Sequence, residues 1–142
     1  FRLTLSPKIR FHGMVGGETK SSLLNGSSAL IFPVRWHEPF GLAVIESLYF
    51  GCAVFGTPYG ALPEIVPDDC GTLATSTPAL AQALMTKNIN PRACHARAVD
   101  LFNVQKMCGG YLMKYEAVSS GEKLNRNSPR LRHEFKGLPW DD

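Results

Sequence analysis

The sequence predicts an α/β fold in which a parallel sheet is wrapped by helices. Three consecutive segments carry this prediction: an apolar run at 29–34, a helix at 40–50 that ends at Gly51, and a second apolar run at 52–55. Short apolar runs of this length are typical of buried strands, and strand, turn, helix and strand in this order form a parallel crossover unit. Ligands of such sheets bind beyond the carboxyl ends of the strands, so we expect the site at that edge.

The remaining segments extend the same pattern. In chain order, the other expected elements are a strand at 8–13, a short helix at 18–24, one helical turn within 57–67, a further strand, and helices at 79–87 and 92–118. Pro91 opens the last helix, and Gly109-Gly110 would permit a bend in it. The basic segment 119–142 is expected to be an extended tail, with Trp140 anchoring its end.

Composition and charge exclude several classes of protein. A length of 142 residues, 44% of them hydrophobic and 19% charged, suits one ordinary globular domain. The net charge of +3 is too small to indicate a nucleic acid or a membrane as partner. The longest apolar region falls short of the ~20 residues of a membrane span, and no signal peptide is visible. We therefore expect a cytoplasmic protein that is at most peripheral at the inner face of a membrane.

The cysteines and the paired acids give no sign of a metal or redox site. The four cysteines lack C-x-x-C pairing and zinc-ligand spacing: Cys52, Cys70, Cys94 and Cys108. We interpret them as structural thiols in a reducing compartment. Asp68 and Asp69 are adjacent on a turn, where two side chains rarely face one ion together. We predict no metal and no cofactor.

Glu46 is the unusual residue of the central helix. It is the only charged residue between Pro39 and Pro58, on a helix that is apolar nearly all round. A helix without a polar face is normally packed on most sides, so we expect Glu46 to be partly buried. A buried carboxylate costs several kcal/mol unless it finds hydrogen-bond donors. Ligand hydroxyls are one candidate; backbone amides or a lone basic side chain are the alternative.

A second acid, Glu38, lies eight residues earlier and just before the helix starts. At roughly 1.5 Å of rise per residue, Glu46 lies about 7 Å along the helix axis from Gly41 in the first turn. Two carboxylates would then flank a helix N-terminus whose free amides attract anions. A ligand with hydroxyls at both ends and phosphate in the middle fits this arrangement, and a nucleotide diphosphate sugar is such a molecule.

The same residues resemble a known family. Segment 38–46, EPFGLAVIE, resembles the E-x7-E motif of retaining glycosyltransferases with two Rossmann-like domains, the GT-B fold of family 4. Segments 51–57, 60–66 and 71–73 resemble three further motifs of that family in the expected order. The resemblance covers about residues 9–118. It implies a Rossmann-like fold and the C-terminal, donor-binding half of such an enzyme.

The resemblance also implies roles for particular residues. Glu46 would bind the ribose hydroxyls of the nucleotide, and Glu38 would lie beside the transferred sugar as the best candidate for a catalytic role. The diphosphate would be held by the backbone amides at the helix start, those of Phe40, Gly41 and Leu42.

The loop before the first helix is a second candidate for contact with the donor. Gly16-Gly17 would let the backbone approach a ligand closely. In the resembled family this loop meets the nucleotide base, which would place Val15, Gly16 and Lys20 near it. The alternative is a plain connecting loop with a solvated Lys20.

These expectations combine into one hypothesis about organisation and function. Residues 1–118 would form the donor-binding domain of a retaining glycosyltransferase, and 119–142 its tail. Because the chain begins with Phe1 rather than Met, we expect it to be a piece of a longer protein, and the resemblance implies that an acceptor-binding domain for a glycan or lipid-linked sugar precedes it. The alternatives are a sugar-nucleotide 2-epimerase, a non-catalytic module that binds sugar nucleotides, and a catalytically dead relative that serves as a scaffold.

Overall fold

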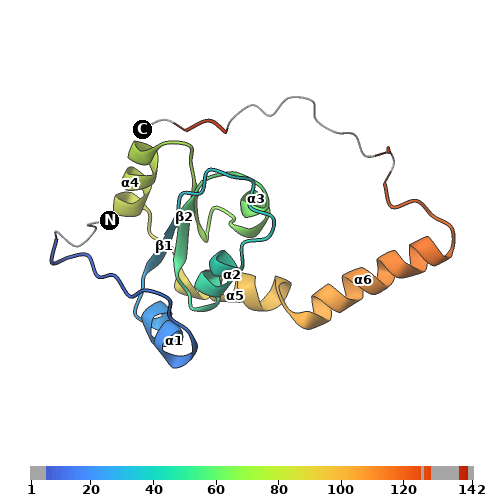
Figure 1. Ribbon diagram of the computed structural model, residues 1–142, viewed down its shortest axis with the longest axis horizontal. Coiled ribbons are helices and arrows are strands. Elements are labelled where there is room, and N and C mark those ends of the chain that lie inside the picture. Colours follow the sequence, from blue (N-terminus) through green and yellow to red (C-terminus); the bar gives the residue numbers. More distant parts are fainter. Residues whose placement is uncertain (1–5, 126, 129–137, 141–142) are drawn as a thin grey trace.

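A computed structural model describes residues 6–125, 127–128 and 138–140 of the chain. Figure 1 shows a small sheet surrounded by helices, with the last helix extending away from the body. In chain order the elements are α1 (Gly17–Asn25), β1 (Ala29–Phe32), α2 (Leu42–Tyr49), β2 (Ala53–Gly56), α3 (Leu62–Ile65), β3 (Gly71–Leu73), α4 (Thr77–Thr86), α5 (Pro91–Leu101) and α6 (Val104–Ser119).

The three described strands form one parallel sheet in the order β1-β2-β3. Leu30 pairs with Val54 across β1 and β2, and Val54 pairs with Gly71 across β2 and β3. All four residues of the central strand β2 are buried, as expected for a parallel strand that is covered on both faces. The prediction of an α/β fold with a Rossmann-like parallel sheet flanked by helices is confirmed.

Side chains of β2 alternate between two hydrophobic clusters, one on each face of the sheet. Val54 packs with Val44 and Leu48 of α2 and with Cys94 of α5 in the larger cluster. Ala53 and Phe55 point to the other face and pack with Leu80 of α4, against which Trp140 is partly buried. The sheet is thus held between α2 and α5 on one side and α4 on the other.

Two of the predicted elements are wrong. Residues 9–13 have no regular secondary structure, so the strand expected at 8–13 is not formed, and the sheet of the described residues consists of β1, β2 and β3. The helix expected over 92–118 is divided at Phe102 and Asn103 into α5 and α6. The side chain of Asn103 accepts a hydrogen bond from the amide of Lys106 and so starts a new helix. The Gly109-Gly110 pair lies inside α6, which is continuous through these residues.

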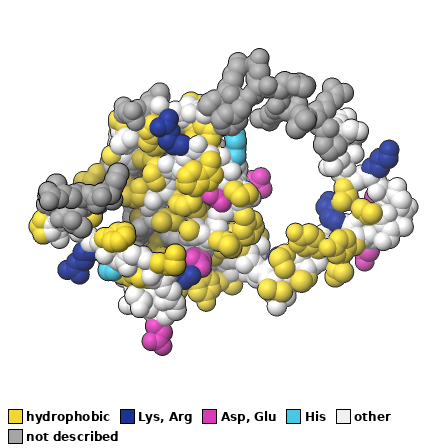
Figure 2. All heavy atoms as spheres, in the orientation of Figure 1, with side chains coloured by type: hydrophobic (Ala, Val, Ile, Leu, Met, Phe, Trp, Pro, Cys, Tyr) yellow, Lys and Arg dark blue, Asp and Glu magenta, His cyan; other side chains and the backbone are white. Residues whose placement is uncertain are grey.

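Helix α6 has no buried residue, and hydrophobic side chains are prominent along it in Figure 2. Of the tail expected at 119–142, the structure describes only 119–125, 127–128 and 138–140. The tail's basic residues Arg126, Arg130, Arg132 and Lys136 lie outside the described residues. The boundary at residue 118 stays a prediction. In the described part of the chain, no helix combines the length and the apolar character that crossing a membrane requires.

The cysteines differ sharply in exposure. Cys52, Cys70 and Cys94 are buried and free, whereas Cys108 on α6 is exposed. Burial, and to a smaller extent the neighbouring Cys94 and Asp69, raise the pKa of the Cys70 thiol to about 12. Burial also raises the pKa of Cys94 and of Cys52.

This difference gives a prediction about thiol reactivity and alkaline stability. At pH 8 we expect Ellman's reagent to modify Cys108 rapidly in the native protein and the other three only after unfolding, because the thiolate is the reacting form. Above pH 9 an unfolded Cys70 ionises while the folded one stays protonated. The free energy of unfolding should therefore fall as the pH rises from 9 towards 12. Fast reaction of two or more native thiols would contradict this assignment.

Candidate functional site

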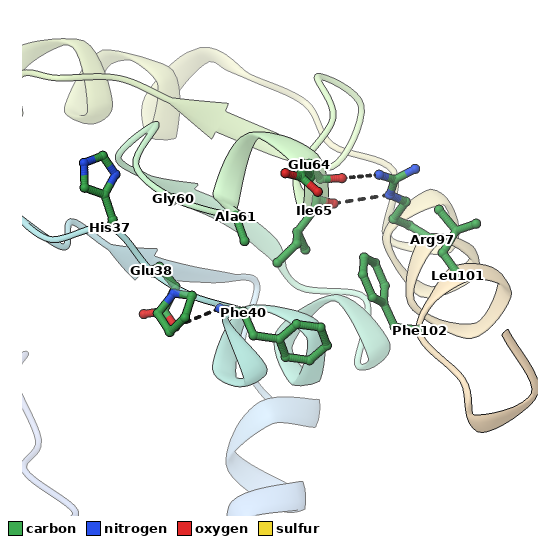
Figure 3. Close-up of a pocket in the computed structure, with 11 residues that line it drawn as sticks. His37, Glu38, Phe40, Gly60, Ala61, Glu64, Ile65, Arg97, Leu101 and Phe102 are labelled. Atoms are coloured by element: carbon green, nitrogen blue, oxygen red, sulfur yellow. Dashed lines mark hydrogen bonds between the residues drawn. The ribbon is translucent and has the colours of Figure 1, made fainter. Parts of the chain in front are cut away.

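A cleft of about 700 Å³ opens beyond the carboxyl ends of β1 and β2. Figure 3 shows that its walls come from the loop after β1, from α3 and the residue pair before it, and from the end of α5. Apolar side chains such as Phe40, Ile65 and Phe102 line it together with polar groups of Glu38, Glu64 and Arg97. This cleft lies at the edge of the sheet where the sequence predicted a ligand site.

The loops after β1 and β2 are joined by backbone contacts. The Ala61 amide donates to the Glu38 carbonyl at 2.8 Å, and Glu38 pairs with Gly60 as an isolated parallel bridge. The backbone of Gly60 has a φ of +69°, and a Cβ atom there would lie 2.2 Å from the Glu38 carbonyl oxygen. Only glycine fits this position. Its lack of a side chain is what allows the Glu38 backbone to be held against the neighbouring loop.

The carboxylate of Glu38 is half-buried and fully engaged. Its Oε1 atom accepts from the Gly41 amide at 3.0 Å and from the Phe40 amide at 3.5 Å. Its Oε2 atom accepts from the indole Nε1 of Trp36 at 3.1 Å. The negative charge of Glu38 thus lies at the positive, N-terminal end of helix α2.

This arrangement uses two of the amides that the sequence assigned to a diphosphate. The sequence predicted that the amides of Phe40, Gly41 and Leu42 hold a diphosphate, but Glu38 already accepts from the first two. Among the described residues, none accepts a hydrogen bond from the amides of Leu42 and Ala43, and both residues are exposed. These two amides are the donors at the helix start that remain for a ligand.

Glu46 differs from its expected environment. The expectation of a partly buried side chain is wrong: 46% of the Glu46 side chain is exposed, and its Oε1 atom accepts from Lys20 Nζ at 2.7 Å. Helix α2 buries only the face that carries Val44, Ser47 and Leu48. The helix is therefore packed on one side, and the lone basic side chain considered as an alternative partner is Lys20.

The predicted site residues, the catalytic candidate Glu38 and the donor-binding residues, fall into two groups. Glu38 and Phe40 line the cleft, and Gly41 and Leu42 follow them directly. The second group lies toward α1 and does not line the cleft as the described residues define it: Val15, Gly16, Lys20 and Glu46. Val15 and Gly16 precede α1, and Gly16 is its N-cap. The Lys20–Glu46 ion pair joins α1 to α2. Helix α2 connects the two groups of predicted residues, because Leu42 belongs to the first group and Glu46 to the second.

Sequence reasoning missed two contacts that shape the site. Arg97 of α5 donates through Nε to the Ile65 carbonyl at 3.3 Å and through its terminal nitrogen to the Glu64 carbonyl (Figure 3). It thereby satisfies carbonyl groups at the C-terminal end of α3. The indole of Trp36 holds Glu38. Neither contact had a signal in the sequence, because a loop tryptophan and a helical arginine are compatible with many partners.

The described part of the chain contains no cluster of side chains that could bind a metal ion. None of its groups of His, Cys, Asp and Glu reaches three side chains that could hold one ion.

Comparison with known proteins identifies the family. The model of the family described as "Glycosyl transferases group 1" matches residues 2–92. The chain belongs to the glycosyl transferases group 1 family. This match covers β1, α2 and β2 and therefore the whole connection between Glu38 and Glu46.

Two curated relatives are mannosyltransferases by name. The chain is 30% identical over 116 residues to a GDP-mannose-dependent alpha-(1-6)-phosphatidylinositol dimannoside mannosyltransferase of Mycobacterium tuberculosis H37Ra. The equivalent protein of strain CDC 1551 has the same identity. The alignment covers 78% of this chain and 30% of the relative. The chain thus spans about a third of the length of these curated relatives.

The contact between the two loops gives a stability prediction. We expect Gly60→Ala to lower the free energy of unfolding by roughly 2–4 kcal/mol, because the new Cβ meets backbone atoms and the φ is positive. Urea denaturation measures this change. Gly109→Ala is the matched control: no atom lies within 4 Å of a Cβ there, and alanine favours the helix. Equal stability of the two variants would show that the loop contact is not required.

Proposed function

We propose that this chain is the donor-binding part of a retaining glycosyltransferase that uses a nucleotide diphosphate sugar. The observation that carries the proposal is the placement of the Glu38 carboxylate, which lies in a cleft beyond the strand ends and next to a helix start with free amides. Membership of the family supports sugar transfer. GDP-mannose is the first donor to test, because the name of the relative specifies it.

The two acidic residues have different tasks in this proposal. Glu46 would accept hydrogen bonds from the ribose hydroxyls through Oε2, to which no described residue donates, while Lys20 retains Oε1. The amides of Leu42 and Ala43 would hold phosphate oxygens at the positive end of α2. The loop with Val15 and Gly16 would approach the base.

Glu38 would act on the sugar. Cleavage of the anomeric C–O bond proceeds through an oxocarbenium-like state that a nearby negative charge stabilises. Both oxygens of Glu38 already accept hydrogen bonds from Trp36 and Gly41, which lowers their nucleophilicity and fixes their position. This engagement supports charge stabilisation or sugar binding by Glu38 over nucleophilic attack.

The alternatives predict different products. A sugar-nucleotide 2-epimerase would isomerise the donor without an acceptor, and neither the family nor the relatives point to isomerisation. A non-catalytic module would bind the donor without consuming it in any assembly. Incubating the complete protein with UDP, GDP and ADP sugars, with and without glycan or lipid-linked acceptors, separates these three outcomes by the products formed.

The assignment of Glu46 is tested by donor binding. We expect Glu46→Ala to abolish measurable binding of the nucleotide sugar in titration calorimetry, because hydrogen bonds to a charged acceptor contribute roughly 1.5–3 kcal/mol each. Glu18→Ala, on the exposed first turn of α1, is the control and should bind as the wild type does. Unchanged affinity of the Glu46→Ala variant would show that Glu46 does not bind the ribose.

The assignment of Glu38 is tested by turnover. In the complete enzyme, Glu38→Ala should lower kcat by roughly 10²–10³-fold, the size of effect found for a group that stabilises transition-state charge. The affinity for the donor should fall far less, because the loss of the contact with the sugar is offset by the loss of repulsion between Glu38 and the phosphates. Equal losses in kcat and in donor affinity, measured by steady-state kinetics and calorimetry, would contradict the division of tasks.

A further inference from the structure

We infer that Trp36 is a positioning residue that orients the Glu38 carboxylate through its indole N–H group. The contact is direct: Trp36 Nε1 donates to Glu38 Oε2 at 3.1 Å. No other described residue donates to that oxygen, since the amides of Phe40 and Gly41 both donate to Oε1. The inference rests on the proposed function, because it assigns Trp36 to the site in which Glu38 acts.

The surroundings of Trp36 argue against a packing role. Its side chain is 55% exposed, although a tryptophan that stabilises a core is normally well covered. It belongs to neither hydrophobic cluster. It also forms no aromatic pair among the described residues. The hydrogen bond to Glu38 is therefore the specific interaction that the described structure gives this indole.

The geometry of the carboxylate explains why a second donor matters. Hydrogen bonds to Oε1 alone hold that oxygen, but coupled changes of the side-chain torsions can still rotate the carboxylate around it and move Oε2. A donor on Oε2 stops this rotation, so both oxygens have fixed positions relative to the helix start. A charge that acts on a transition state depends on such fixed positions, because reorientation during the reaction costs free energy.

The backbone also supports this arrangement. Trp36 and Glu38 are two residues apart in a loop whose ends are held: the Thr57 hydroxyl donates to the Val34 carbonyl at 2.6 Å, and Ala61 donates to the Glu38 carbonyl. The donor and the acceptor therefore belong to one fixed loop. A ligand in the cleft would meet a Glu38 carboxylate whose orientation is already set.

The first test is spectroscopic and needs no activity. The chain has two tryptophans, Trp36 and Trp140, and hence two indole N–H signals in a ¹⁵N–¹H spectrum. Trp36→Phe assigns them. Glu38→Ala should shift the Trp36 signal because its acceptor is lost, and should leave the Trp140 signal in place. An unmoved Trp36 signal would overturn the inference at the level of the contact.

The second test is a double-mutant cycle in the complete enzyme. With GDP-mannose, or whichever nucleotide sugar supports turnover, Trp36→Phe should lower kcat roughly 10- to 100-fold, the equivalent of one hydrogen bond to a charged group. The KM for the donor should stay within about twofold. In the Glu38→Ala background, Trp36→Phe should have no further effect, because it acts through Glu38.

A matched substitution and the remaining outcomes make the test decisive. Trp140→Phe removes an indole N–H elsewhere and should leave kcat unchanged. If Trp36→Phe lowers kcat equally with and without Glu38, or lowers only stability, Trp36 has a structural role and the inference is wrong. If the wild-type enzyme turns over no nucleotide sugar, the proposed function fails and the positioning role fails with it. The indole shift would still show whether the contact exists.

Discussion

The candidate site depends on one close approach between two loop backbones. Glu38 and Gly60 lie so near each other that a Cβ on the glycine would stand 2.2 Å from the opposing carbonyl oxygen. Parallel strands bring the two loops to the same edge of the sheet, but they do not by themselves bring the loops into contact. Because Gly60 has no side chain, the two loops can come into contact. This contact fixes the end of the loop after β1, immediately before helix α2. The position of the acid is thus a property of the backbone before any side-chain contact is made.

A consequence of that placement is that the protein supplies its own anion to the helix start. The partial positive charge of the first turn of α2 is met by the Glu38 carboxylate through the amides of Phe40 and Gly41. A phosphate group brought to the same helix start would therefore lie near a negative charge, and repulsion between them raises the free energy of binding. Under the proposed function the donor must offset this repulsion through its other contacts. The neighbouring amides of Leu42 and Ala43 and the ammonium of Lys20 are available for that purpose.

The sequence predicted what is determined locally and missed what depends on tertiary neighbours. The apolar runs of β1 and β2 and the helix between them follow from patterns within a few residues, and they are found with shifts of one or two residues at their ends. The burial of Glu46 could not be inferred in the same way. A uniformly apolar helix is normally covered on most sides, yet Leu42 on α2 is 68% exposed. Which sides of a helix are covered depends on its neighbours in the fold, and the sequence of the helix itself does not contain that information. The break before α6 was missed because an asparagine can cap a helix or lie elsewhere in the chain, and the sequence alone does not distinguish the two for Asn103. The paired glycines instead suggested a bend at the wrong position. The indole of Trp36 reaches Glu38 through loop geometry that no periodicity encodes.

The two acids of the site differ most in how firmly they are held, and this difference matches the tasks proposed for them. Glu46 makes one ion pair with Lys20 in which both side chains are more than two-fifths exposed, and an interaction of this kind contributes at most about 1 kcal/mol. A ribose hydroxyl can therefore share or replace Lys20 at little cost, as a residue that must bind and release a ligand requires. Glu38 is half-buried, and moving it would leave three donors without their acceptor at once. A carboxylate held in this way is unsuited to following a ligand and suited to keeping one position throughout a reaction. If a donor is bound at this edge of the sheet, Glu46 is the contact that adapts to it and Glu38 the contact to which the donor must adapt.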